Sequence, residues 1–224
     1  MNTLPARLDQ QGVINTYRRI APLYDLWSRL TESRAHQLAL EVAQVRNGER
    51  VLEVAAGTGL MFKQLVQKNP DGDNQAVDLC DAMLARARRR LEGIEATSVH
   101  LRLGNARQLP FEDQQFDLLM NNYMFDLLPE SAFADVLSEF RRILKPGGRL
   151  VLINMTQAER FGEGVYSLVY RLNPKWMGGC RGVMMSQPLS EAGFVDIERQ
   201  RLSQMRFPSE IITARRPDEQ FHTD

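Results

Sequence analysis

The sequence is poor in the residues that build covalent or metal-bound frameworks. It contains two cysteines, Cys80 and Cys180, and three histidines, His36, His100 and His222. The cysteines form no C-x-x-C pair and the histidines have no metal-ligand spacing, so we expect neither a disulfide framework nor a zinc site. We therefore predict no metal centre.

The sequence also lacks an excess of either charge, with 28 basic and 28 acidic residues among 224. Domains that bind nucleic acid over a whole surface are usually strongly basic, so we expect no nucleic-acid partner, although a local basic patch is compatible with this balance. No apolar run reaches the roughly 18 residues of a membrane span. Because the N-terminus also lacks a signal-peptide pattern, we expect a cytoplasmic protein.

What the sequence does contain is enough hydrophobic residues, 43%, to bury the core of one domain over residues 1–224. Short apolar runs alternate with helical patterns. We predict strands near 50–55, 74–79, 99–103, 116–121 and 149–154, and helices near 60–68, 81–91 and 131–144. This alternation predicts an α/β fold, with a parallel sheet covered by helices on both faces.

The helix near 131–144 has the clearest pattern. Its apolar residues follow helical spacing and form one stripe, comprising Phe133, Val136, Leu137, Phe140, Ile143 and Leu144. The segment Lys145–Gly148 then stops the helix and turns the chain into the fifth strand.

The two ends of the chain differ from this central alternation. Residues 7–45 have a helical pattern that Pro22 interrupts, whereas residues 156–187 contain no clear strand. A short helix ending at Leu189–Gly193 precedes two strand-like runs, 194–202 and 209–215. The six residues between these runs favour an antiparallel pair at the sheet edge.

The segment from Arg50 to Leu60 contains the most informative motif. It predicts a buried strand, a turn at Gly57 and Gly59, and a helix whose free N–H groups point towards a ligand. Asp78 ends the next strand, where a carboxylate can accept hydrogen bonds from a ribose diol. These features together predict an adenosine-type cofactor.

The same motif departs from a dinucleotide site. Phe62 occupies the position where a dinucleotide fingerprint has its third glycine, and the loop has no basic residue for a pyrophosphate. Glu53, at the end of the first strand, suits a ligand with a cationic amine or sulfonium. An NAD(P)-dependent oxidoreductase therefore remains an alternative that explains the glycines and Asp78 but not Phe62.

The chain resembles the class I S-adenosylmethionine-dependent methyltransferases, specifically their ubiquinone/menaquinone C-methyltransferase-like branch. The resemblance covers most of the chain, in the order and spacing of six segments: 17–25, 51–59, 76–84, 104–111, 116–117 and 141–148. It implies a Rossmann-like seven-stranded sheet with an antiparallel last strand. It also implies S-adenosylmethionine as cofactor and S-adenosylhomocysteine as product.

The resemblance also implies a cofactor site, residue by residue. The methionine end of the cofactor is lined by Glu53 and the turn residues Ala55, Ala56, Gly57, Thr58 and Gly59. Asp78 takes the ribose hydroxyls, and Leu79, Met83, Asn105 and Ala106 surround the adenine. Asn121 and Asn122 border the sulfonium, and Tyr17 and Tyr24 belong to an N-terminal helical lid.

The resemblance leaves the acceptor and the base open. Ala55 and Ala56 replace a more usual glycine and small residue, which is tolerable if φ stays negative. A proton-bearing nucleophile would need a base, for which Tyr123, Asp126 and Asp25 are candidates by position only. We expect Asp126 to be an exposed loop residue.

We divide the domain into a lid (1–46), a cofactor-binding core (47–155), an acceptor-side insert (156–187) and a terminal helix with antiparallel strands (188–217). The insert contains Met and aromatic residues that favour either an apolar acceptor pocket or the packing of an irregular cap: Tyr166, Tyr170, Trp176, Met177, Met184 and Met185. We predict methyl transfer to a small apolar or amphipathic molecule, quinone-like or phospholipid-amine-like. A lipid acceptor would imply peripheral membrane contact. The alternative is a methyltransferase-like protein with a regulatory or partner role.

Overall fold

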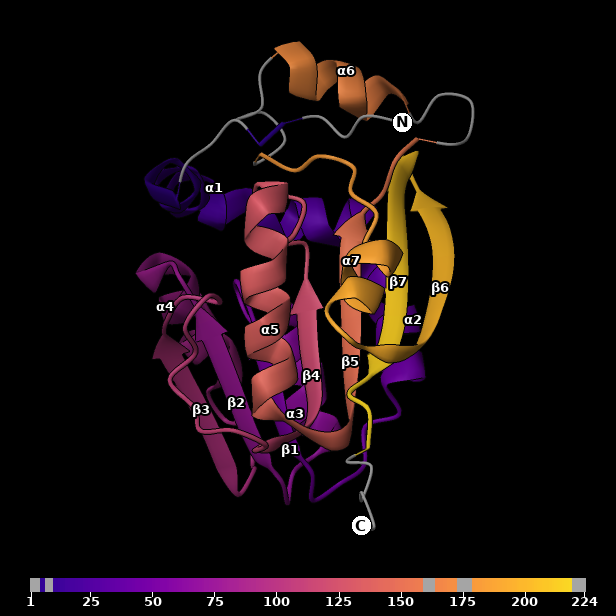
Figure 1. Ribbon diagram of the computed structural model, residues 1–224. Coiled ribbons are helices and arrows are strands. Elements are labelled where there is room, and N and C mark those ends of the chain that lie inside the picture. The colour runs from indigo at the N-terminus through magenta and orange to yellow at the C-terminus, as the bar shows by residue number, and fades with distance from the viewer. Residues whose placement is uncertain (1–4, 7–9, 159–163, 173–178, 219–224) are drawn as a thin grey trace, which may run out of the picture.

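A computed structural model describes residues 5–6, 10–158, 164–172 and 179–218 of the chain (Figure 1). The described residues contain one seven-stranded sheet with the order β3-β2-β1-β4-β5-β7-β6. Its strands are β1 (Arg50–Val54), β2 (Asp73–Asp78), β3 (Ser98–Leu103), β4 (Phe116–Asn122), β5 (Leu144–Met155), β6 (Val195–Gln204) and β7 (Phe207–Arg215).

The strand directions confirm the predicted fold class. β1 pairs in parallel with both β2 and β4, β2 pairs in parallel with β3, and β4 does so with β5. β7 pairs antiparallel with β5 on one side and with β6 on the other. β7 therefore runs against the other strands, which makes the sheet mostly parallel with an antiparallel last strand.

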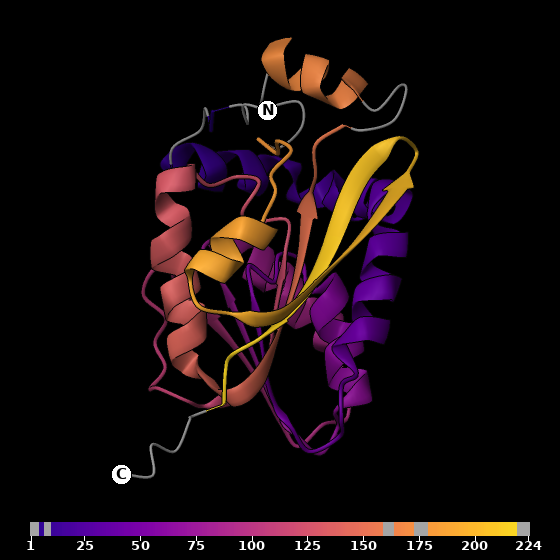
Figure 2. The ribbon, with the colours of Figure 1, turned by 45° about the vertical axis from the view of Figure 1, so that its right-hand side comes forward.

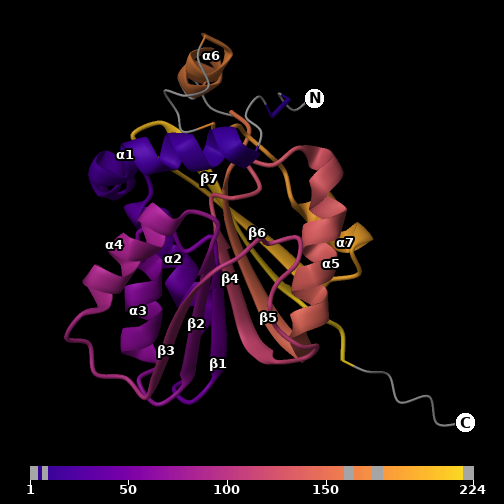
Figure 3. The ribbon, with the colours of Figure 1, turned by 90° about the vertical axis from the view of Figure 1, so that its left-hand side faces the viewer.

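Helices cover both faces of this sheet, as predicted. The helical elements are α1 (Gln10–Thr31), α2 (Ser33–Ala43), α3 (Leu60–Lys68), α4 (Asp81–Leu91), the 3-10 turn η1 (Glu130–Ala132), α5 (Phe133–Ile143), α6 (Gly164–Leu172) and α7 (Ser186–Glu191). Figure 3 shows α2, α3 and α4 on one face and α5 and α7 on the other. α1 crosses the carboxyl ends of the parallel strands, with α6 beyond it (Figures 1 and 2).

Each face of the sheet packs its own apolar cluster against these helices. All six residues of the predicted stripe are buried, five of them in α5 and the sixth, Leu144, at the start of β5. The α5 side chains pack on strand residues such as Leu52 and Leu119. On the other face, Ala39 of α2 and Phe62 and Leu65 of α3 pack on the opposite side of the same strands. The two clusters hold the strand ends rigidly in place below α1.

The N-terminal region differs from its prediction in two ways. α1 continues through Pro22 instead of breaking there, although proline removes a backbone hydrogen bond inside a helix. Contacts on both sides hold it: Tyr17 packs against Cys80 and Met83, and Trp27 lies edge-to-face on Phe207 at 6.1 Å between ring centroids. α2 belongs to the sheet-covering layer, so α1 is the part of residues 1–46 that lies over the strand ends.

The connection between the last two strands is also shorter than predicted. β6 and β7 are joined by Met205 and Arg206 instead of six residues, and both have positive φ, at 50° and 63°. Positive φ at both central residues is typical of a two-residue type I′ turn, which usually contains Asn-Gly or a similar pair. Met205 and Arg206 are not residues of this kind, so no local pattern predicts the tight hairpin.

No described helix is both long and apolar enough to cross a membrane.

Candidate active site

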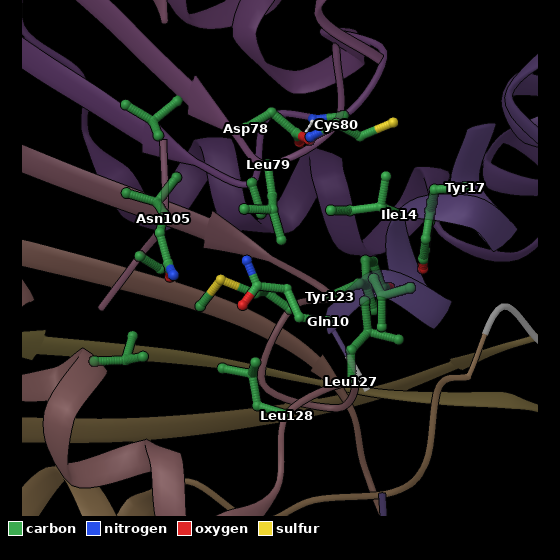
Figure 4. Close-up of a pocket in the computed structure, with 18 of the residues that line it drawn as sticks. Gln10, Ile14, Tyr17, Asp78, Leu79, Cys80, Asn105, Tyr123, Leu127 and Leu128 are labelled. Carbon is green, nitrogen blue, oxygen red and sulfur yellow. Dashed lines mark hydrogen bonds between the residues drawn. The ribbon is translucent and has the colours of Figure 1, made fainter. Parts of the chain in front are cut away.

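A cavity of about 350 Å³ lies at the carboxyl ends of the parallel strands. The strand order reverses between β1 and β4 at this point, and such switch points are where open α/β sheets bind ligands. Its walls come from α1 and from the segments after β1, β2, β3 and β4. Figure 4 shows Ile14 and Tyr17 of α1 around the same space as Asp78 and Asn105 of the strand ends.

The cavity contains ten of the residues that the sequence singled out. They are Tyr17, Ala55, Gly57, Asp78, Leu79, Met83, Asn105, Ala106, Asn122 and Tyr123. Its lining does not include Asp25, Glu53, Ala56, Thr58, Gly59, Asn121 or Asp126, and the side chain of Tyr24 lies outside the described residues.

The turn after β1 has left-handed backbone at three positions. Ala55, Gly57 and Gly59 have φ of 60°, 55° and 76°. A Cβ on Gly59 would lie 2.9 Å from the Cβ of Ala87, so glycine allows α3 and α4 to approach closely. The condition that φ stays negative at Ala55 is not met, and this residue carries the strain of a left-handed alanine.

Asp78 ties this turn to the end of β2. One carboxylate oxygen accepts the Gly57 N–H at 2.7 Å and the other accepts the Cys80 N–H at 2.8 Å. Burial raises the pKa of Asp78, while the backbone N–H groups of Cys80, Gly57 and Leu79 act to lower it. The carboxylate is thus held at the cavity wall by backbone donors.

Glu53 does not line the cavity itself but contacts a residue that does. Its Oε1 accepts a hydrogen bond of 2.7 Å from Nδ2 of Asn122, which lines the cavity. Its Oε2 and the Oδ1 of Asn122 are buried without a hydrogen-bond partner among the described residues. Burial raises the pKa of Glu53 well above its usual value, so a cationic group reaching this pair would stabilise the ionised form.

Asn121 is not part of the cavity lining. Its Nδ2 donates to the Val54 carbonyl at 2.8 Å, and its side chain is fully buried. This bond fixes the ends of β1 and β4 relative to each other.

A network behind the turn joins α1 to the fold. The Thr58 hydroxyl, expected at the methionine end of the cofactor, donates to Asp25 at 2.6 Å instead. Arg90 donates to the Thr58 carbonyl at 2.7 Å and forms an ion pair with Asp25. The run of Arg86, Arg88, Arg89 and Arg90 in the sequence predicts a solvated helix face, but Arg90 lies in this network instead. Asp25 is paired there as well.

Asp126 is the clearest error of the sequence-based expectations. The expected exposed loop residue is fully buried, because the chain after β4 folds back under β5 and residues 179–183. Its Oδ2 accepts the Met155 N–H at 3.4 Å, and its Oδ1 has no partner among the described residues. Burial raises the pKa of Asp126 to about 7, with backbone and Cys180 hydrogen bonds opposing the rise.

The other two base candidates are also engaged away from the cavity. The Tyr123 hydroxyl shares a hydrogen bond of 2.8 Å with Ser209 on β7, although the residue itself lines the cavity. Asp25 is held by Thr58 and Arg90. Tyr17, which also lines the cavity, has its hydroxyl 3.8 Å from Sγ of Cys180.

The insert does not supply the cavity wall through its described residues. Met185 is fully buried in the core, Met184 is exposed, and Tyr166 packs on Phe207. Trp176 and Met177 lie outside the described residues, as does the side chain of Tyr170. The described apolar wall comes instead from residues without a local motif: Val13, Ile14, Leu127, Leu128 and Pro129. Only the helical spacing of Val13, Ile14 and Tyr17 could have indicated a shared face.

The fold and site together define a class I methyltransferase-type domain. A family model described as a methyltransferase domain matches residues 51–148. The demethylmenaquinone methyltransferase of Thermus thermophilus is 32% identical over 160 residues, covering 70% of this chain and 70% of that protein. The ubiquinone/menaquinone biosynthesis C-methyltransferase UbiE of Paracoccus denitrificans is 30% identical over 158 residues, covering 68% of this chain and 62% of that protein.

The chain belongs to the class I S-adenosylmethionine-dependent methyltransferase family, and within it resembles the ubiquinone/menaquinone branch. It spans about two thirds of the length of these curated relatives. The solved structure of the [4+2]-cyclase SpnF shares the fold, with a TM-score of 0.74 and 18% identity over 97% of this chain and 100% of that one. These findings favour the methyltransferase hypothesis over an NAD(P)-dependent oxidoreductase.

Proposed function

We propose that this chain transfers the methyl group of S-adenosylmethionine to a small amphipathic acceptor bound in the same cavity. The observation that supports this proposal is that the cavity at the switch point has both polar and apolar lining residues. Polar strand ends with Asp78 and Asn122 form one wall, and apolar residues of α1 and the segment after β4 form the other.

The residues present fit the cofactor. Glu53 and Asn122 offer buried oxygens without partners among the described residues, which suits a cationic amine. A Cβ on Gly57 would meet nothing within 4 Å, so the turn leaves open space for a ligand against its backbone. Asp78 would accept the ribose hydroxyls, and Leu79 and Met83 would pack on the adenine.

When bound, S-adenosylmethionine supplies a methyl carbon activated by a positively charged sulfur. The chain's part is to hold a nucleophilic atom about 3–3.5 Å from that carbon and to exclude water, which can supply about 7–11 kcal/mol of the barrier. Ile14, Leu127 and Leu128 exclude water from one side of the cavity. Because Asp25, Tyr123 and Asp126 all bond elsewhere, we propose that positioning contributes more than a side-chain base.

The names of the curated relatives favour a quinone-like acceptor over a phospholipid amine. The apolar wall supports either, since both kinds of molecule have an apolar part. A cytoplasmic location stays a prediction that cell fractionation would check, and the division into lid, core, insert and terminal strands also stays a proposal.

Thermal-shift titration with S-adenosylmethionine, S-adenosylhomocysteine and NAD tests the cofactor. A ligand at 100 times its dissociation constant stabilises by about 2.7 kcal/mol, which at this chain length raises the midpoint by roughly 5–10 °C. We expect this response to the two sulfur compounds, and a response to NAD alone would overturn the proposal. Incubation of the cofactor carrying a labelled methyl group with demethylated quinones then tests transfer, with heat-inactivated protein as control.

A second candidate is a methyltransferase-like protein that binds the cofactor in a regulatory or partner role. This role is favoured because all three candidate bases form their hydrogen bonds outside the cavity. The SpnF structure also shows that a protein named as a cyclase shares this fold. Binding of S-adenosylhomocysteine without transfer to quinone-like or amine acceptors would support this candidate.

A further inference from the structure

α1, α6 and the turn between β6 and β7 lie at one end of the molecule (Figures 1 and 2), and they contain seven exposed apolar residues. We call them the docking face, and they are Leu26, Trp27 and Leu30 of α1, Val165, Leu168 and Leu172 of α6, and Met205 at the tip of the hairpin. Leu26, Leu172 and Met205 are 61%, 69% and 65% exposed. Scattered exposed apolar residues are ordinary, but a contiguous group marks an interaction surface.

Contacts beneath the docking face show that α1, α6 and the hairpin meet at Phe207. Trp27 of α1 and Tyr166 of α6 both pack edge-to-face on Phe207, at 6.1 and 5.2 Å between ring centroids. The Tyr166 hydroxyl donates to the Met205 carbonyl at 2.9 Å. Gln204 donates to the Leu30 carbonyl at 2.7 Å and therefore fastens the hairpin to the end of α1.

α6 is unusual for a surface helix because it is apolar on two sides. Tyr166 and Val169 pack on the core cluster, whereas Val165, Leu168 and Leu172 face outward at 49%, 56% and 69% exposure. A surface helix normally carries polar residues on its outer side, and a helix that is apolar all round belongs in a core or a lipid environment. The outward side of α6 thus fits an apolar medium better than water.

The charges beside the docking face decide which occupant fits. Arg29 lies between Leu26 and Leu30, Arg206 follows Met205, and Arg34 donates its backbone N–H to Gln204, directly before the hairpin turn. All three arginines are exposed, in a chain whose net charge is zero. Exposed apolar side chains next to cations complement a bilayer with anionic headgroups.

We infer that the docking face binds the surface of an anionic lipid bilayer, from which an amphipathic acceptor reaches the cavity. The route of the acceptor rests on the proposed function, whereas the binding itself does not. α1 joins the two, because Ile14 and Tyr17 line the cavity and Leu26 and Leu30 belong to the docking face of the same helix.

Vesicle flotation of the full chain tests the inference. Vesicles of phosphatidylcholine alone are compared with vesicles that also contain phosphatidylglycerol, at low and high salt. We expect tighter binding to the anionic vesicles, with a loss of about fivefold for each of Arg29→Gln and Arg206→Gln. The triple variant Leu30→Ser/Leu168→Ser/Met205→Ser should bind anionic vesicles at least roughly tenfold more weakly than the wild type.

Val195→Ser is the matched control. Val195 is 43% exposed and lies at the opposite end of β6 from the hairpin tip, so this variant should bind vesicles as the wild type does. Thermal unfolding of each variant checks that it is folded. Failure of the wild type to bind anionic vesicles, or equal binding by wild type and triple variant, would overturn the inference.

Two further measurements distinguish membrane binding from self-association of the chain and from the proposed function. A wild-type dimer that the triple variant dissociates, without vesicle binding, would assign the docking face to a second copy of the chain. Titration with S-adenosylhomocysteine separates the proposed function: a normal response without vesicle binding overturns only the docking inference. Vesicle binding without any response to the cofactor overturns only the proposed function.

Discussion

Asp126 provides the sharpest test of the structure through the pH dependence of stability. Burial raises its pKa from 3.8 to about 7, so between these values the folded protein keeps a proton that the unfolded chain releases. The folded state then binds more protons than the unfolded state, and the free energy of unfolding falls as the pH rises through this window. Above about pH 7 the penalty is constant.

The size of the effect follows from the same values. At 1.36 kcal/mol for each pH unit, the interval from 3.8 to about 7 corresponds to a cost of about 4 kcal/mol at neutral pH. Asp126→Asn has nearly the same shape and can still accept the Met155 N–H, but it never ionises. We therefore expect the variant to be more stable than the wild type at about pH 8, by a margin that shrinks by roughly 2–3 kcal/mol at about pH 5.

Urea unfolding of wild type and variant across this pH range measures the margin, and subtraction cancels the other titrating groups. Glu41→Gln, on the exposed side of α2, serves as the control for removal of a surface carboxylate, and its effect on stability should be small. A margin for Asp126→Asn that is constant from about pH 5 to about pH 8 would refute the buried, high-pKa carboxyl group.

Three further predictions address the site and its surroundings. Ala55→Gly relieves a left-handed alanine, worth about 1–2 kcal/mol, against a glycine entropy cost of about 0.5–1 kcal/mol; urea unfolding should show a net gain of up to about 1 kcal/mol, and a clear loss would contradict the backbone conformation. Asp78→Asn removes a carboxylate that holds two backbone N–H groups and faces the cavity, so calorimetry should show S-adenosylhomocysteine affinity falling about tenfold or more, with the exposed Asp135→Asn unchanged. Burial lowers the pKa of His36 to about 4, so the folded protein binds fewer protons than the unfolded chain between about pH 4 and 6.5 and loses about 3 kcal/mol as acid is added; His36→Phe should flatten this acid limb in urea unfolding, and an unchanged slope would argue against a buried neutral imidazole.

The elements that could be predicted from the sequence are those with a local physical cause. The strand ending at Val54, the turn at Gly57 and Gly59 and the strand ending at Asp78 follow from apolar runs, glycine conformations and a terminal carboxylate within about 30 residues. The α5 stripe follows from helical spacing. Such signals do not depend on the rest of the chain, so the fold class and the turn facing Asp78 follow from them. Other lining residues, such as Leu79 and Asn105, were named only through the family resemblance.

The errors concern residues whose environment is made by distant segments. Asp126 is buried by β5 and by residues 179–183, and Arg90 is drawn from solvent by Asp25 of α1. Pro22 is tolerated because α1 is held on both sides of it, and the Met205-Arg206 turn is enforced by pairing of β6 with β7. Tertiary contacts override local propensity in each case, and a sequence pattern contains no record of them.

The network of Asp25, Thr58 and Arg90 has a consequence for the kinetics of ligand exchange. α1 forms one wall of the cavity, and it is fastened to α4 by this network and by the exposed ion pair between Arg18 and Asp81, at 2.9 Å. Moving that wall aside separates opposite charges, and dissolved ions ease such a separation. We therefore expect a higher ionic strength to increase the rate at which product leaves the cavity. The affinity for the product should change much less.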